Sequence, residues 1–212
     1  MDIKILQKHL KNAYKKYKTH QVRSLQLINQ TLSILSKMSL ANEKKFYSPT
    51  LLENFDSLPD RLTFKLYQQL NSLIPDLIKI VNEFEKITFE IEDIKSKFSL
   101  ELREIYKLKA NYNNSNLEVL EEFEQSLNEV VDMFSTELIL RKQILSELES
   151  YNKLKPAQMS LYVSIWMNEV FIEKEKFFYL LEEFNEIERI LETPYTSFQE
   201  VEPQDSNSAK LQ

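Results

Sequence analysis

The sequence predicts an all-α fold, an elongated antiparallel helical bundle or coiled coil of about four to five helices with a disordered C-terminal tail. Its 212 residues include no glycine, the residue that supplies the positive-φ corners of tight hairpins and phosphate-binding loops. A balance of 42% hydrophobic and 28% charged residues can bury one face of each helix and leave the other in water. A long apolar run at heptad spacing in the second expected helix adds the third indication.

A basic N-terminal helix is expected over residues 1–38, beginning after Asp2, which is a suitable N-cap residue. Its apolar stripe recurs at helical spacing but drifts, so its packing partner is not a simple two-stranded zipper. The stripe comprises Leu6, Leu10, Ala13, Tyr17, Leu25, Ile28, Leu32 and Leu35.

The charge of this first helix differs from that of the rest of the chain. Residues 1–45 carry ten Lys or Arg against Asp2 and Glu43, although the whole chain has a net charge of −6. The basic helix could contact nucleic acid, or it could lie against the acidic helices of its own bundle. We favour the intramolecular interpretation, because the lysines are not interleaved with the aromatic residues on which single-stranded nucleic acids stack.

Residues 39–58 are predicted to be a linker, because Asn42, Ser48-Pro49 and Asn54 interrupt the helical pattern. Residues 59–192 are then expected to form an antiparallel coiled-coil hairpin followed by C-terminal helices. In the first of these helices the apolar positions alternate by four and three, with Glu101 taking one core position and Pro75 kinking the helix without ending it. That repeat requires a left-handed supercoil against another helix. Its residues are Leu66, Leu70, Leu73, Leu77, Ile80, Phe84, Ile87, Ile91, Ile94, Phe98, Ile105 and Leu108.

The asparagine-rich run at 111–116 is the predicted hairpin turn, since asparagine tolerates the left-handed corner that glycine usually fills. A third helix from about Leu117 to Leu148 is expected to run antiparallel to the second. Lys155-Pro156 separates it from a shorter helix that ends at Trp166, and a last amphipathic helix is expected over 172–191. Residues 193–212 are polar and contain prolines, which predicts a disordered tail.

Residues for catalysis or metal binding are scarce. His9 and His20 are the only histidines, and their spacing places them three helical turns apart, too far to share a metal ion. The chain has no cysteine, so it has neither disulfides nor thiolate ligands. Acidic pairs such as Glu121-Glu122 are expected to lie on solvated helix faces, because no Glu-x-x-His motif accompanies them. The sequence therefore predicts a protein that is not an enzyme, with no metal, cofactor or small-molecule substrate.

The chain is expected to be soluble and intracellular. No apolar run approaches the ~18 residues that a membrane span needs. The first residues also lack the apolar core of a signal peptide. We therefore expect no membrane association.

The least generic segment runs from Glu137 to Ile172 and contains the single tryptophan, Trp166. Its first helix is densely apolar but is interrupted by Arg141-Lys142, which indicates neighbours on two sides. Trp166 can bury ~200 Å² and anchor either an internal corner or a protein interface. On physical grounds alone the internal corner is favoured.

Residues 123–172 resemble the cyclin-dependent-kinase-interacting protein family known as CINP. The likeness rests on the E-L-x-L-[RK]-[RK] pattern at 137–142, the S-[IM]-W-[LM] run at 164–167, and the aromatic-aliphatic pair Phe171-Ile172. The resemblance implies a nuclear, non-catalytic adaptor of cell-cycle kinase, DNA replication and checkpoint machinery. It also implies association with an AAA ATPase complex that acts in replisome turnover and ribosome biogenesis. The residues then expected to bind a partner are Glu137, Leu138, Arg141, Lys142, Trp166, Phe171 and Ile172.

The expected partners are other proteins, namely helical subunits of a hetero-complex in the nucleus, with or without a cytoplasmic pool. The alternative is a structural coiled-coil subunit of a kinetochore, spindle or tethering complex, in which the heptad helix pairs with another chain. Direct nucleic-acid binding is the least favoured hypothesis. Ser48 and Thr193, each followed by proline, are candidate phosphorylation sites in predicted loops.

Overall fold

The computed structural model describes residues 2–41, 43–107, 114–149 and 156–192. These residues form helices and no strand, which confirms the predicted all-α bundle. Thr193 and the predicted tail lie outside the described residues, as do Leu108 and residues 111–113 of the predicted turn. Residues 114–116 of that turn instead form the start of α4. The helical elements are α1 (Ile3–Ala41), the short 3-10 helix η1 (Lys44–Phe46), α2 (Pro49–Asn54), α3 (Leu58–Lys107), α4 (Asn114–Glu149), α5 (Pro156–Asn168) and α6 (Lys174–Glu192).

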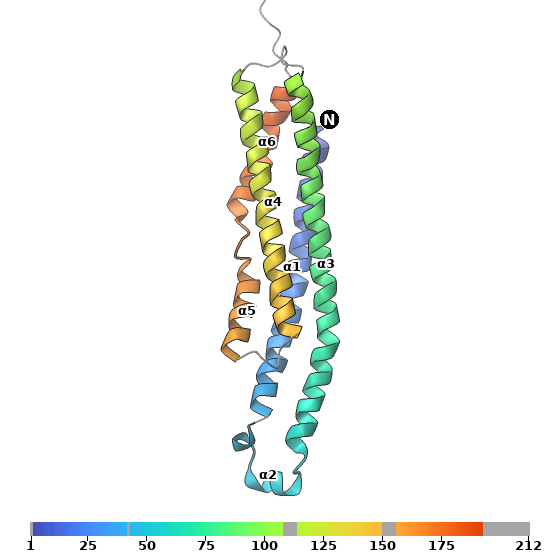
Figure 1. Cartoon of the computed structure of the whole chain (residues 1–212), viewed down its shortest axis with the longest axis vertical. Coiled ribbons are helices and arrows are strands. Elements are labelled where there is room, and N and C mark those ends of the chain that lie inside the picture. The colour runs from blue at the N-terminus through green and yellow to red at the C-terminus, as the bar shows by residue number, and fades with distance from the viewer. Residues whose placement is uncertain (1, 42, 108–113, 150–155, 193–212) are drawn as a thin grey trace, which may run out of the picture.

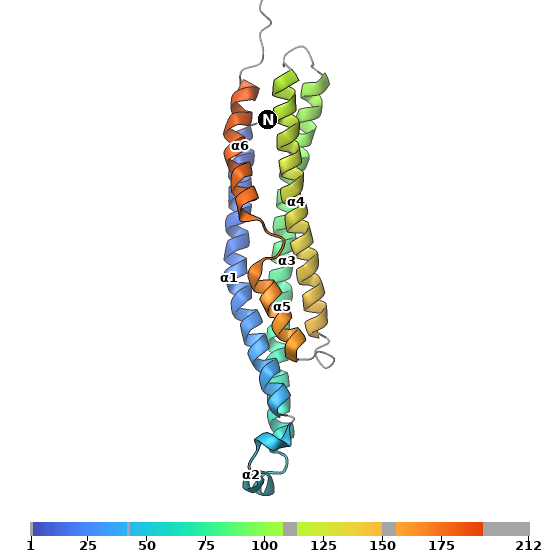
Figure 2. The same ribbon diagram turned by 90° about the vertical axis from the view of Figure 1, so that its left-hand side faces the viewer.

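Three long helices, α1, α3 and α4, lie side by side, and α5 and α6 share the fourth position of the bundle end to end (Figures 1 and 2). α3 and α4 run antiparallel, as the sequence predicts for a hairpin. α5 packs mainly on α1, whereas α6 packs on both α1 and α4. Of the described helices, α1 and α3 extend beyond the ends of α4 and α5, and they form a two-helix arm capped by η1 and α2.

The heptad residues of α3 form the spine of the core. They contribute to two apolar clusters, one shared with α6 and the other shared with α5. Two positions differ from the prediction, and Leu73 is one of them because it is only half-buried. Leu102 is buried and Glu101 is only half-buried, because the seam shifts by one residue after Phe98 to keep an apolar side chain inward.

The interruptions in the sequence have smaller effects on the helices than their residue types suggest. α3 passes through Pro75 without ending, as the unbroken heptad pattern predicts. The segment expected to be a linker, 39–58, contains the last turn of α1 as well as η1 and α2. Ser48 caps α2 by accepting a hydrogen bond from the Leu51 amide at 3.3 Å, which is the usual role of serine at a helix start.

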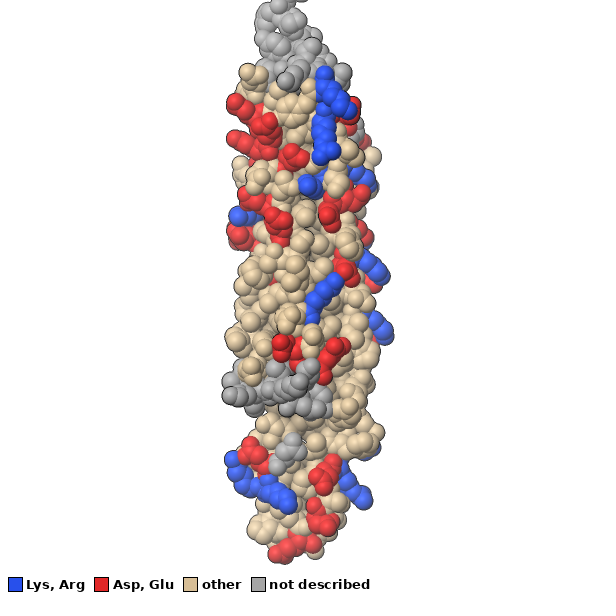
Figure 3. Space-filling model, in the orientation of Figure 1, with Lys and Arg blue, Asp and Glu red and all other residues tan. Residues whose placement is uncertain are grey.

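Part of the basic face of α1 is paired with acidic residues of neighbouring helices. Lys4 lies 2.5 Å from Glu188 of α6, and Lys16 lies 2.7 Å from Glu90 of α3. Figure 3 shows acidic side chains gathered over the end of the molecule where α4 and α6 lie, with a largely uncharged stretch at mid-length. No helix in the described ranges is both long and apolar enough to cross a membrane.

Candidate interaction site at the Trp166 corner

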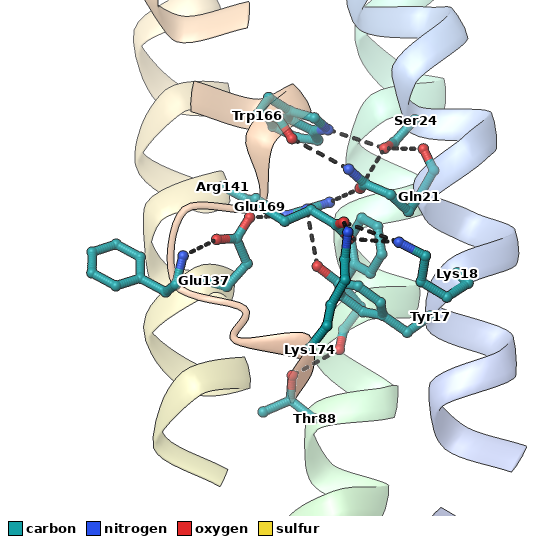
Figure 4. Close-up of polar contacts among 12 residues, drawn as sticks. Tyr17, Lys18, Gln21, Ser24, Thr88, Glu137, Arg141, Trp166, Glu169 and Lys174 are labelled. Carbon is teal, nitrogen blue, oxygen red and sulfur yellow. Dashed lines mark hydrogen bonds and ion pairs between the residues drawn. The ribbon is translucent and has the colours of Figure 1, made fainter. Parts of the chain in front are cut away.

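Trp166 attaches α5 to α1. Its side chain is fully buried, and its Nε1 donates a hydrogen bond to Ser24 Oγ at 3.0 Å. The Trp166 carbonyl in turn accepts one from Gln21 Nε2 at 3.3 Å (Figure 4). Ser24 Oγ also donates to the Gln21 carbonyl at 2.8 Å. The indole N–H therefore has a partner although no water reaches it, which makes the burial of this large side chain favourable.

Glu137 and Arg141 form an ion pair one turn apart on α4, and each side chain is only 1% exposed. Arg141 Nε donates to Glu137 Oε1 at 2.8 Å. The two terminal nitrogens of Arg141 reach α1, where Nη1 donates to Gln21 Oε1 at 2.6 Å and Nη2 to Tyr17 Oη at 3.0 Å. A buried ion pair is tolerable only when its geometry is good and further hydrogen bonds satisfy its remaining atoms, and this pair meets both conditions.

Aromatic rings surround the Arg141 guanidinium. Its central carbon lies 4.3 Å from the ring centroid of Phe84, 5.2 Å from that of Trp166 and 5.5 Å from that of Tyr17. Cation–π attraction is strongest where water is excluded, as it is here. Burial raises the pKa of Tyr17 well above its ordinary value, although the nearby Arg141 acts in the opposite direction. Tyr17 thus remains a neutral hydroxyl that can accept the hydrogen bond from Arg141.

Glu169 forms the corner between α5 and α6. Its φ is 48°, in the left-handed region where a residue with a side chain is uncommon. The Glu169 carboxylate turns inward to Lys18 of α1 at 2.9 Å and to Lys174 of α6 at 3.5 Å. These ion pairs offset the strain at a position that glycine would occupy in most chains. On the other side of the corner, the Phe171 amide donates to Glu137 Oε2 at 3.2 Å.

The side chains of Val170 and Phe171, next to Glu169 at this corner, project outward. With Glu169 turned inward and the Phe171 amide held by Glu137, the side chains of Val170 and Phe171 are 55% and 42% exposed. Met167, in the last turn of α5, is also exposed. We call Met167, Val170 and Phe171 the corner surface. It presents three apolar side chains on a backbone that the buried polar cluster holds in place, a combination typical of protein interfaces.

The structure separates the predicted partner-binding residues into two groups. Phe171 and Lys142 are exposed, and Lys142 lies 2.5 Å from Glu85 of α3, whereas Leu138 is half-buried. The remaining predicted residues are buried. In this conformation their side chains cannot contact a partner, and they instead support the corner surface. That group consists of Glu137, Arg141, Trp166 and Ile172.

Sequence reasoning placed Tyr17 on the buried stripe of the first helix but missed its hydrogen bond to Arg141, and it missed Gln21, Ser24 and Glu169 altogether. The first three lie on the buried stripe of α1. A signal for them was present, because the spacing 17, 21, 24, 28, 31, 35 continues the heptad pattern with polar residues at core positions. Glu169 carries no comparable signal, since its left-handed backbone depends on contacts made by distant helices.

The two histidines lie elsewhere. His9 and His20 line an open groove of about 560 Å³ between α1 and α3, together with Lys16 and Glu90. The His20 ring lies edge-on to Phe84 with centroids 6.3 Å apart. In the described parts of the chain, no three His, Cys, Asp or Glu side chains form a group that could hold a metal ion.

A family model described as "Ribosome biogenesis protein C1orf109-like" matches residues 5–170. This chain belongs to the C1orf109-like family. The matched range covers all but the first two residues of α1 and continues through α5. It therefore includes the ion pair of α4, Trp166 and Glu169. CINP, the family that residues 123–172 resemble, is related to the C1orf109-like family but is not the one that matches. No curated protein matches the chain.

For a C1orf109-like chain, the geometry of this site is that of a scaffold. Its charged groups are directed at one another and are buried together, so they hold α1, α4, α5 and the start of α6 in one arrangement. The surface that this arrangement offers to other molecules is apolar, namely the side chains of Met167, Val170 and Phe171.

Proposed function

We propose that this C1orf109-like protein is a non-catalytic adaptor in ribosome biogenesis, and that it binds a helical protein partner through the corner surface. The observation that carries the proposal is the outward placement of Val170 and Phe171. The Glu137 carboxylate holds the Phe171 amide, and the Glu169 carboxylate turns inward to Lys18. Apolar side chains on a preorganised backbone bind with little loss of conformational entropy. The family description supplies the biological process.

The chemistry of the corner surface favours a protein partner over nucleic acid or a small molecule. Met167, Val170 and Phe171 carry no charge that could neutralise phosphates. A partner with an apolar cleft or an amphipathic helix would cover them. We therefore propose a hetero-complex of helical subunits as the setting in which the chain acts.

The CINP resemblance suggests a narrower role. In that role the adaptor acts in the nucleus with an AAA ATPase complex that serves ribosome biogenesis and replisome turnover, and it connects to cell-cycle kinase and DNA replication machinery. We propose this ATPase assembly as the first partner to examine. The alternative of a coiled-coil subunit of a kinetochore, spindle or tethering complex has less support, because the heptad face of α3 packs on α1 and α4 of the same chain.

Pull-down with quantitative mass spectrometry tests the proposal. The tagged full chain is compared with the variant Val170→Ser/Phe171→Ser, and Phe89→Ser is the matched control because Phe89 is an exposed aromatic residue on α3. We expect the double variant to recover at least tenfold less of one ribosome-biogenesis protein than the natural chain does. The control variant should recover the same amount as the natural chain. Thermal melting must show that both variants remain folded. Equal recovery of every partner by the folded double variant would refute the proposal.

A further inference from the structure

The part of α1 between Lys4 and Arg23 carries more positive charge than the acidic residues around it neutralise. Three of its seven cations pair with carboxylates of neighbouring elements, namely Lys4, Lys16 and Lys18. Among the described residues, no carboxylate lies within ion-pair distance of the other four, which are all exposed. We call these four residues, Lys8, Lys11, Lys15 and Arg23, the cationic row. A row of unpaired cations on one helix face is the electrostatic signature of a surface that binds a polyanion.

The cationic row follows the solvent side of α1. Lys8 and Lys15 are seven residues apart, close to two full turns, so they lie one above the other about 10 Å apart along the helix. With Arg23 the row reaches a length of about 22 Å. Lys15 also lines the open groove between α1 and α3, where His9 and His20 add further polar side chains. Cations spaced along such a length can contact several phosphates of an extended strand.

An exposed aromatic side chain lies beside the cationic row. Phe178 of α6 is 50% exposed, and its ring lies edge-on to that of Tyr14 with the centroids 5.7 Å apart. Tyr14 precedes Lys15 in the chain and is one turn from Lys11, and Figure 2 shows α6 lying along this part of α1. The fold therefore supplies, from a distant element, the aromatic partner that the lysines lack in the sequence.

We propose that the cationic row binds single-stranded RNA, with phosphates on Lys8, Lys11 and Lys15 and a base against Phe178. Proteins that bind single strands without sequence preference combine cations along the backbone with exposed rings on which bases stack. A duplex keeps its bases paired and stacked, so only the cations would act on it. A glutamate-rich protein segment has the charge but no base to stack.

The family description, ribosome biogenesis, is the reason to specify RNA and not DNA. The proposal goes beyond the adaptor function, because it adds a second class of partner at a different surface. It does not depend on the corner surface, since it uses none of the three residues that form it.

Fluorescence anisotropy with a labelled single-stranded RNA tests the charge contacts on the purified full chain. If each cation of the row neutralises one phosphate, the affinity should fall about 20-fold over a threefold rise in salt concentration. We expect Lys8→Gln/Lys11→Gln/Lys15→Gln to bind at least tenfold more weakly at low salt. Its affinity should fall only about twofold over the same rise, because one contact remains.

The matched control is Lys37→Gln/Lys44→Gln/Lys65→Gln, which removes the same number of charges from exposed positions outside the row. It should bind RNA as the natural chain does, and thermal melting must show that both triple variants remain folded. No RNA binding by the natural chain, or equal losses in the row variant and the control, would overturn the proposal.

A single ring substitution tests the stacking contact. Phe178→Leu keeps an apolar side chain against Tyr14 but removes the aromatic face, and Phe89→Leu is the control because Phe89 is an exposed ring on α3. We expect Phe178→Leu to weaken RNA binding at least fivefold without changing its salt dependence, since stacking releases no counterions. Unlabelled duplex RNA and a polyglutamate peptide should compete at least tenfold less well than the single strand. Unchanged affinity of Phe178→Leu, or equal competition by either competitor, would contradict the proposal.

Discussion

Replacing Arg141 with methionine should destabilise the bundle strongly, because the change leaves a buried charge without its partner. Glu137 is 1% exposed and would retain only the Phe171 amide at 3.2 Å as a hydrogen-bond donor. Gln21 Oε1 and Tyr17 Oη would also lose the hydrogen bonds that Arg141 donates to them, but both are neutral groups, so the largest loss falls on the charged Glu137 carboxylate. Removing one member of a buried ion pair costs about 3–5 kcal/mol. For a chain of this length, that corresponds to a fall in Tm of roughly 6–20 °C.

Thermal and urea unfolding followed by circular dichroism would measure this effect. Lys142→Met is the matched control, because Lys142 is the adjacent residue but is exposed, and an exposed ion pair contributes about 1 kcal/mol or less. The double variant Glu137→Leu/Arg141→Met removes both charges and should recover most of the lost stability. The reasoning is refuted if Arg141→Met costs no more than Lys142→Met, or if the double variant is less stable than Arg141→Met alone.

Two further predictions concern α6 and α3. Burial raises the pKa of the Glu183 carboxyl above its ordinary value, so the unfolded chain ionises first as pH rises and stability falls until the folded carboxyl ionises too. Glu183→Gln should therefore be more stable than the natural chain at pH 7 but not at pH 3, and equal differences in urea unfolding at both pH values would contradict this. Pro75→Ala should raise the unfolding free energy, because alanine restores the amide that can donate to the Asn71 carbonyl in the exposed part of α3; an unchanged or lower urea midpoint would count against this reasoning.

The helices could be predicted because their signals are local. The heptad alternation from Leu66 to Phe98 identifies the buried face of α3, and the same pattern carries the helix past Pro75. The shift from Glu101 to Leu102 could not be predicted by counting heptads, since an α-helix drifts relative to a strict 3.5-residue repeat. The final position is set by which side chain the neighbouring helices can bury.

The candidate site could be predicted only in part. The segment containing Arg141 and Trp166 was identified, but its role depends on where the two side chains point. Their partners Tyr17, Gln21 and Ser24 lie more than a hundred residues earlier in the chain. Such pairings arise from tertiary packing, which residue types and spacing in one sequence do not encode directly.

The buried polar cluster also determines how the long helices align along the bundle axis. An apolar heptad seam tolerates a slip of seven residues, because one leucine or isoleucine then replaces another. Such a slip of α1 past α4 would place Arg141 opposite Ile28, which has no acceptor, instead of Gln21. The guanidinium would be left buried without its partners, and slipped bundles would be disfavoured by several kcal/mol. Arg141 thus fixes how the helices of this glycine-free bundle are aligned along the bundle axis.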